Sequence, residues 1–594
     1  MPFRAGLLAL ALLVAVGTSA RGDDLDSIMY REPALPLPRV EKTFPKGLTD
    51  LWLAALERPD RDTRSRAALT IASAHERGMP GLSVTVSPLT RLLELPDQHP
   101  AVRAAAARAL VTLAAKDAAP VLLRLAKSDD PELREIIEPA LARWNDPSVR
   151  DVWLERLSQP PPHGRDVLLA ARGLGTVRDE RAASRLRTLA LSSEAVPSLR
   201  LAAAHALGDI RTTGALPDAE RLATSQGMTD RLVAASLLRR HDGAEVVRLL
   251  QTLAKDAEPS VALVSLTRLL QLDVAHILPV VVPVLASPDA EVRRFGIEAL
   301  FQSPTPERIQ SLGQLLADPH PNVRVKARQS LRELAKAAQW QPPVIAEATR
   351  ALDASDWRVQ EQAAILLGQL GHKAAAKRMI ELLKSERGEV LVAVGWGLRQ
   401  LAVPDTLAPI LEHVRSRHAE IARGTTRVVP DQHLSHLVQL LGQSRYAPAD
   451  PVLRAIVPRV TAGTYTGPKG PPPTFTKVGG ETRAAAIWAL GLLHEGKPED
   501  RLVKQIEDRL TGDPGMGPDD PRVRRMAAVS LGRLQAKQSL TALRTFADGT
   551  EPSLDLVAQA CRWSLSRLTG EKMPDLGTVE VSQRAWFLAP LADR

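Results

Sequence analysis

Residues 318–331 read DPHPNVRVKARQSL, and variants of this motif recur along most of the chain. Its frame is Asp-Pro, then Val-Arg, then a small residue four positions after the valine and leucine eight positions after it. Copies begin at Val102, Leu199, Val292, Val323, Val359, Val390, Thr482, Val523 and Val557. The four starts from Val292 to Val390 lie 31, 36 and 31 residues apart. A fixed period of this length predicts a solenoid of stacked repeats.

The motif also explains how each repeat folds. An aspartate just before a helix can accept hydrogen bonds from the free backbone N–H groups of the first turn. Apolar residues at offsets 0, 4 and 8 from the valine line one face of that helix. A small residue at offset 4, such as Ala327, lets neighbouring helices approach closely. We find no sustained period-2 alternation, so the sequence predicts an all-α fold with few strands.

Two copies resemble HEAT-like repeats of the short, phycobilisome-lyase-like type most clearly. They are Asp318-Pro319 through Leu331, and residues 520–532, which read DPRVRRMAAVSLG. The resemblance implies a right-handed α-α superhelix of antiparallel helix pairs over residues 48–573. It also implies that the repeated arginines form a structural ladder. Scaffolds, adaptors and bilin lyases occur in this group, and Leu391 and Ala558 depart from its arginine position.

The two ends of the chain differ from the repeats. Arg4, an apolar run from Ala5 to Val16 and the small-x-small pattern Ala20-Arg21-Gly22 predict a cleaved signal peptide over residues 1–22. The mature protein is therefore expected to be exported, without a transmembrane segment. Residues 23–47 form a Pro-rich leader that we expect to be extended. Loop insertions are expected at 416–432 and 464–480, and a tail at 574–594.

The composition and the reactive residue types give little indication of catalysis or metal binding. The chain has 594 residues, a net charge of +9 and one cysteine, Cys561, which occupies the small-residue offset of its repeat. It is expected to be buried and unreactive. His433 and His436 share a helical face, with His413 and His418 nearby, but we find no convincing third metal ligand. The basic charge is interspersed with acid, so nucleic-acid binding is not favoured. We expect no cofactor and no enzyme activity.

The repeat register singles out one column of residues. Offset 6 points away from the centre of the buried stripe, and in HEAT-like solenoids the second helices line the concave surface. This column comprises Arg108, His205, Glu298, Gln329, Ile365, Trp396, Trp488, Val529 and Trp563. Its last five members are apolar. Tryptophan is favoured at binding hot spots, so these five are candidate partner-binding residues. The alternative is that neighbouring layers or the 464–480 loop cover the rings as ordinary packing.

The resulting hypothesis is an exported, non-catalytic scaffold that binds a protein or peptide partner in the concave groove. A second hypothesis is a binder of envelope polysaccharide or another anionic polymer through the tryptophan stripe. A third is a lyase-like enzyme of the HEAT-like group. The export signal disfavours the third, because bilin lyases act on cytosolic proteins.

Overall fold

The computed structural model describes residues 25–36, 39–128, 130–158, 164–423, 430–459, 477–513, 516–547, 555–573, 578–583 and 585–589. The predicted signal peptide, residues 1–22, lies outside these residues, as does most of the expected 464–480 insertion. The chain divides into two compact units. Unit 1 contains residues up to Arg39 and from Ser303 to Val579. Unit 2 contains Val40–Gln302 and the residues from Glu580 onward.

Both units are built almost entirely from α-helices, which confirms the all-α prediction. The helices of unit 2 are α2 (Leu48–Leu56), α3 (Arg61–Glu76), α4 (Val86–Glu94), α5 (Pro100–Thr112), α6 (Ala119–Ala126), α7 (Pro131–Trp144), α8 (Arg150–Ser158), α9 (Gly164–Val177), α10 (Ala183–Leu191), α11 (Pro197–Ile210), α12 (Leu216–Ala223), α13 (Met228–Leu237), α14 (Ala244–Leu253), α15 (Pro259–Leu272), α16 (Val281–Leu285) and α17 (Ala290–Gln302). Those of unit 1 are α18 (Pro306–Gln314), α19 (Pro321–Leu334), α20 (Gln341–Leu352), α21 (Trp357–Gln369), α22 (Ala376–Leu382), α23 (Gly388–Leu401), α24 (Leu407–Arg423), α25 (Asp431–Gln443), α26 (Asp450–Ile456), α27 (Gly480–Leu493), α28 (Asp500–Thr511), α29 (Pro521–Leu534), α30 (Leu540–Ala547) and α31 (Leu556–Thr569).

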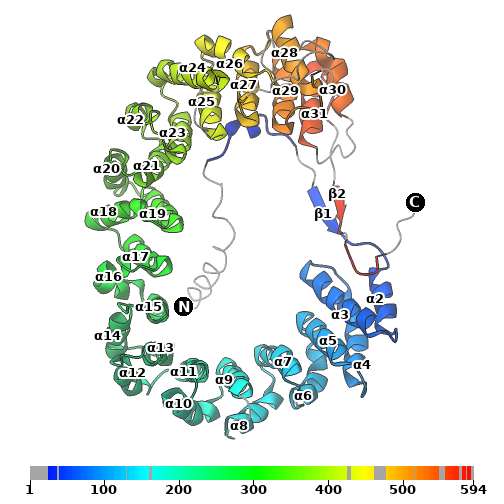
Figure 1. The fold of residues 1–594 in the computed structure, drawn as a ribbon, viewed down its shortest axis with the longest axis vertical. Helices are drawn as coiled ribbons and strands as arrows, with labels where there is room; N and C mark the ends of the chain where they lie inside the picture. Colours follow the sequence, from blue (N-terminus) through cyan, green and yellow to red (C-terminus); the bar gives the residue numbers. More distant parts are fainter. Residues whose placement is uncertain are drawn as a thin grey trace. The chain divides into compact units, whose positions relative to one another are not determined.

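The helices form two layers in each unit. Odd-numbered helices from α3 onward are the second helices of their pairs, and within each unit each of them packs on its neighbouring second helices. We call them the second-helix layer. Figure 1 shows this layer on the inner side of the curve that each unit describes, with the even-numbered helices outside it. Because one pair cannot bury its apolar face alone, the stacking of neighbours supplies the core.

The residues of the repeated motif make the hydrogen bonds expected of them. The Asp130 carboxylate accepts hydrogen bonds from the backbone N–H groups of Glu132 and Leu133, at 3.0 and 3.2 Å. Arg324 donates to the carbonyl oxygens of Asp318 and Pro319, at 2.9 and 3.2 Å. Equivalent bonds to carbonyls of the preceding segment are made by Arg103, Arg293 and Arg524. These four arginines therefore tie α5, α17, α19 and α29 to the chain segment that precedes each of them.

Two features between and beside the repeats differ from the sequence predictions. The expected 416–432 loop is too long, because α24 continues to Arg423 and α25 begins at Asp431. The leader was expected to be extended, but among its described residues a 3-10 turn, η2 (Ile28–Tyr30), is followed by a further turn at 31–33, and 39–43 form strand β1 (Arg39–Thr43). Strand β1 pairs with β2 (Thr578–Ser582), so part of the expected tail is a strand. No helix among the described residues is long and apolar enough to span a membrane.

Candidate functional site

The leader lies against the second-helix layer of unit 1. Figure 1 shows the η2 turn beside α25 and α27. Met29, in the middle of this turn, has no exposed surface, and its neighbours on either side are half-buried. A short segment near the start of the sequence is thus held by helices near its other end.

Four side chains of the layer recognise the main chain of the leader. Trp488 Nε1 and Arg533 Nη2 both donate to the Glu32 carbonyl oxygen, at 2.7 and 2.8 Å. Arg525 Nη2 donates to the Tyr30 carbonyl at 2.8 Å, and Arg399 Nη2 donates to the Asp26 carbonyl at 2.5 Å. These donors come from α23, α27 and α29. Main-chain carbonyls are present whatever the sequence, and those of Tyr30 and Glu32 lie at or just after η2, so the arrangement suits a short segment in this turn conformation.

Two further side chains of the layer form hydrogen bonds with side chains of the leader. The Glu481 carboxylate accepts hydrogen bonds from the Tyr30 hydroxyl at 2.6 Å and the Ser27 hydroxyl at 2.9 Å. Gln439 Nε2 donates to the Ser27 hydroxyl oxygen at 3.2 Å. We call the set Arg399, Gln439, Glu481, Trp488, Arg525 and Arg533 the leader-binding face.

Burial shapes the electrostatics of this face. It lowers the pKa of Arg399 to about 10, against an opposing effect of Asp26, and the pKa of Arg533 also to about 10. Both guanidinium groups therefore stay charged at neutral pH, and charged donors make stronger hydrogen bonds than neutral ones. Burial and the hydrogen bond to Glu481 raise the pKa of Tyr30. Its hydroxyl therefore remains a donor well into alkaline solution.

Four of the five candidate partner-binding residues are buried, which corrects their expected exposure. Trp488 and Val529 are 0% exposed, and Ile365 and Trp396 are each 4% exposed. The physical reason is that offset 6 also faces the neighbouring second helix. A Cβ added at Gly368 would lie 2.9 Å from the Trp396 ring, so the glycine makes room for that ring. Trp563 is half-buried, with the Arg567 guanidinium 5.7 Å from its ring.

Stacking on sugar rings would need exposed aromatic faces, and Trp396 and Trp488 do not offer them. Of the five candidates, only Trp488 has a hydrogen bond to the leader. The sequence analysis missed the other residues of the leader-binding face. One signal was available for Gln439, because a repeat that starts at His433 puts it at offset 6. Arg399 and Arg533 lie at offsets 9 and 10 of apolar helices, and buried arginines at these positions are the remaining signal.

His433, His436 and Cys561 are buried, and His413 and His418 are half-buried. His413 and His433 Nε2 atoms lie 3.0 Å apart, and His433 Nδ1 is 2.7 Å from the Leu391 carbonyl oxygen. Burial lowers the pKa of His433 to about 3 and of His413 to about 4, so both are neutral at physiological pH. In the part of the chain that the structure describes, no three candidate ligands form a metal-binding group. Cys561 is 0% exposed, and burial raises its pKa to about 12.

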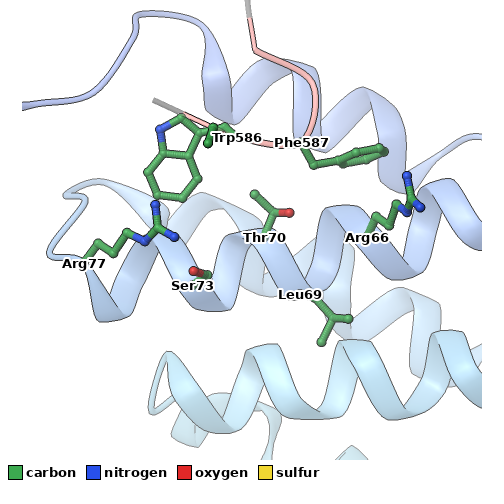
Figure 2. A pocket seen from close by; sticks show the side chains of 8 residues that line it. Arg66, Leu69, Thr70, Ser73, Arg77, Trp586 and Phe587 are labelled. Atoms are coloured by element: carbon green, nitrogen blue, oxygen red, sulfur yellow. The ribbon is translucent and has the colours of Figure 1, made fainter. Parts of the chain in front are cut away.

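The other end of the chain is held in unit 2 in a similar way. Trp52 Nε1 donates to the Phe587 carbonyl oxygen at 2.6 Å, and the Trp586 and Trp52 ring centroids lie 5.7 Å apart. Figure 2 shows Trp586 and Phe587 above α3, each beside an arginine of that helix or its end. The cavity between them has a volume of about 200 Å³. Its aromatic walls belong to the chain's own tail.

Comparison with known proteins agrees with this architecture. Residues 49–142, 246–332 and 345–428 match HEAT repeats. None of the curated protein sequences compared with the chain matches it. The chain is therefore an all-α solenoid that contains HEAT repeats.

Solved structures show the same fold at low sequence identity. Kap95p, the yeast importin-beta, in its complex with RanGDP is 13% identical with a TM-score of 0.51, over 88% of this chain and 72% of Kap95p. Kap121p is also 13% identical with a TM-score of 0.50, over 88% of this chain and 57% of Kap121p. The chain thus spans little more than half of Kap121p. At this identity the likeness concerns the fold.

Proposed function

We propose that this protein is an exported, non-catalytic scaffold whose leader-binding face binds a short segment of a protein or peptide partner. The observation that carries the proposal is the set of four side-chain donors on main-chain carbonyls of the leader. Hydrogen bonds to the main chain of a peptide are a general source of affinity in peptide recognition. Kap95p, which has the same fold, binds the protein RanGDP in its solved complex.

The leader then acts as a ligand in cis, and a partner segment takes its place. Such a segment needs free carbonyls for Trp488 and the three arginines, and an apolar side chain where Met29 is buried. Trp488 is the central contact of the site. Trp563 extends the surface on α31, whereas Ile365, Trp396 and Val529 support it from within the helix stack.

Export and the type of repeat belong to the same proposal. The Arg4, apolar and small-residue order supports cleavage between Ala20 and Asp23, which leaves the leader intact. Amino-terminal sequencing of secreted or periplasmic protein tests this, and intact Met1 on cytosolic protein contradicts it. The 31-residue spacing and the aspartate and arginine contacts of the second helices support repeats of the short, phycobilisome-lyase-like type.

The decisive experiment supplies the leader in trans. A protein that begins at residue 34 is titrated into a fluorescein-labelled peptide of residues 25–36, and anisotropy is recorded. We expect saturable binding, competed by unlabelled peptide. Trp488→Phe removes the indole donor and Arg533→Gln removes the charged donor, and each should weaken binding roughly tenfold.

Arg501→Gln is the matched control, because Arg501 is an exposed residue of the first helix α28. It should bind like the parent. Circular dichroism establishes that each variant is helical. A helical protein that fails to bind the peptide would show that the leader is a fixed part of the fold, and the proposal would be withdrawn.

A further inference from the structure

A cavity of about 400 Å³ opens on the second-helix layer of unit 2, over α7, α9 and α11. Five of its lining residues are small and buried: Ala142, Gly173, Gly175, Ala202 and Ala206. Small residues at these positions leave room that larger side chains would fill. The cavity is distinct from the leader-binding face, which belongs to unit 1.

Close helix packing fixes the floor of the cavity. A Cβ added at Gly175 would lie 2.7 Å from the Ala206 Cα atom, so α9 and α11 are in backbone contact there. A Cβ added at Gly173 would lie 2.7 Å from the Trp153 ring, which packs behind α9. A site on such packed helices is held more precisely than one on loops.

The rim of the cavity has an excess of positive charge. Arg143 and Arg172 line it, both are exposed, and neither forms an ion pair with any described residue. The lining acids are already compensated. The Glu138 carboxylate pairs with Arg156 at 2.5 Å and accepts from Trp153 Nε1 at 2.9 Å. Asp209 pairs with Arg239 at 3.1 Å.

A neutral polar side chain completes the rim. His205 is half-buried, and burial together with the Arg239 charge lowers its pKa, so it is neutral at physiological pH. A neutral imidazole offers one donor and one acceptor. The site thus combines two free guanidinium groups, one neutral polar group and an apolar floor.

We propose that this cavity, between Arg143 and Arg172, binds an acidic peptide segment of a partner and takes up one of its carboxylate side chains. The guanidinium fork matches a carboxylate in a bidentate geometry. The volume holds a side chain and not an extended polymer. Nucleic acid is the less suitable ligand, since its affinity comes from many phosphate contacts and this rim supplies two uncompensated cations.

The test uses the full chain and a fluorescein-labelled hexaglutamate peptide, with anisotropy as the readout. The double variant Arg143→Gln/Arg172→Gln should bind the peptide roughly tenfold more weakly or worse, because it loses both charge-assisted contacts. Its control is Arg91→Gln/Arg221→Gln, which removes the same charge from two exposed arginines of the first helices α4 and α12. The control should bind like the parent.

A second variant tests the cavity without altering charge. Thr176 is an exposed lining residue, and Thr176→Trp should block the entrance and weaken binding to a similar extent. Three results would overturn the proposal. They are equal losses in the two double variants, full binding by Thr176→Trp, and tighter binding of a labelled six-nucleotide oligothymidylate than of the peptide. Each of these concerns unit 2 alone, so failure here leaves the peptide test of the leader-binding face unaffected.

Discussion

The second-helix layer is covered in unit 1 and open in unit 2, although the same repeat builds both. Over α23–α29 the leader lies on the layer and buries Met29. Over α7–α11 a cavity of about 400 Å³ remains, with two exposed arginines at its rim. The repeat therefore determines where a surface lies, and the residues at a few offsets determine whether it is filled.

Offset 6 shows how this difference arises. In α23 and α27 it is occupied by Trp396 and Trp488, whose rings fill the space beside the neighbouring helix. In α9, where Leu174 takes the leucine position at offset 8, offset 6 is Arg172, and in α11 it is His205; Arg172 is exposed, His205 is half-buried, and both line the cavity. Large apolar rings at this offset give a closed apolar surface, and polar side chains leave the surface open.

Removal of the leader should produce the largest difference between the units. A protein that begins at residue 34 loses the burial of Met29 and the seven hydrogen bonds described above, together on the order of 10 kcal/mol of unfolding free energy. Because each repeat of a solenoid contacts only its neighbours, this destabilisation should be confined to unit 1. Hydrogen-exchange mass spectrometry should show faster exchange in α23–α31 and unchanged exchange in α5–α11.

Cys561 provides an independent readout of the same change. It is the only cysteine in the sequence and lies on α31. A thiol reagent should label it slowly in the parent and faster in the protein without the leader. Equal labelling rates in both would mean that the leader contributes nothing to this part of unit 1.

Truncation of single tryptophans should separate buried from partly exposed rings. Trp488→Ala should cost about 3–5 kcal/mol of unfolding free energy, as expected for a large buried aromatic. Trp563→Ala should cost about 1 kcal/mol, since its ring is half-buried. Urea denaturation measures both. Similar costs for the two would contradict the burial difference on which the corrected binding site depends.

Neutralisation of one arginine in each unit should also give unequal results. Arg533→Gln removes a charged donor from the Glu32 carbonyl and should destabilise unit 1 by about 2 kcal/mol. Arg172→Gln should change the stability of unit 2 by less than about 0.5 kcal/mol, because its side chain is exposed. The comparison fails if Arg172→Gln is the more destabilising of the two in denaturation experiments.

The smallest effect is expected from Tyr30→Phe, which removes one hydrogen bond to Glu481 and should cost about 1 kcal/mol at pH 8. The pKa of Tyr30 is raised in the folded protein, so its contribution is full below pH 10 and is lost as the pH rises above 10. The stability gap between parent and variant should therefore narrow between pH 8 and pH 11. A constant gap over this range would exclude the phenol as the titrating group.

Local features of the fold were predictable from the sequence, because they depend on neighbouring residues. The Asp130 cap, the Arg324 contacts and the burial of Cys561 all follow from their positions in the repeat. Residues 416–423 were assigned to a loop because their apolar residues form no clean stripe, yet they continue α24.

The leader contacts were not predictable in this way. They join residues more than 370 positions apart, and the seven residues from Asp26 to Glu32 have no periodicity that would indicate their partner. The exposure of four offset-6 candidates was mispredicted for a related reason; they are Ile365, Trp396, Trp488 and Val529. Their exposure depends on the next helix in the stack and on the segment above it, and neither is encoded in the helix that bears the residue.

The contact between Ser27 and Glu481 spans 454 residues of sequence. At a synthesis rate of about 5 to 20 residues per second, the leader emerges roughly 20 to 90 s before α27 has been made. During that interval the helices from α2 onward are made in turn, and the leader-binding face is still incomplete. The leader is thus already tethered to the chain when α27 and α29 appear, so this ligand in cis reaches the face ahead of a partner segment.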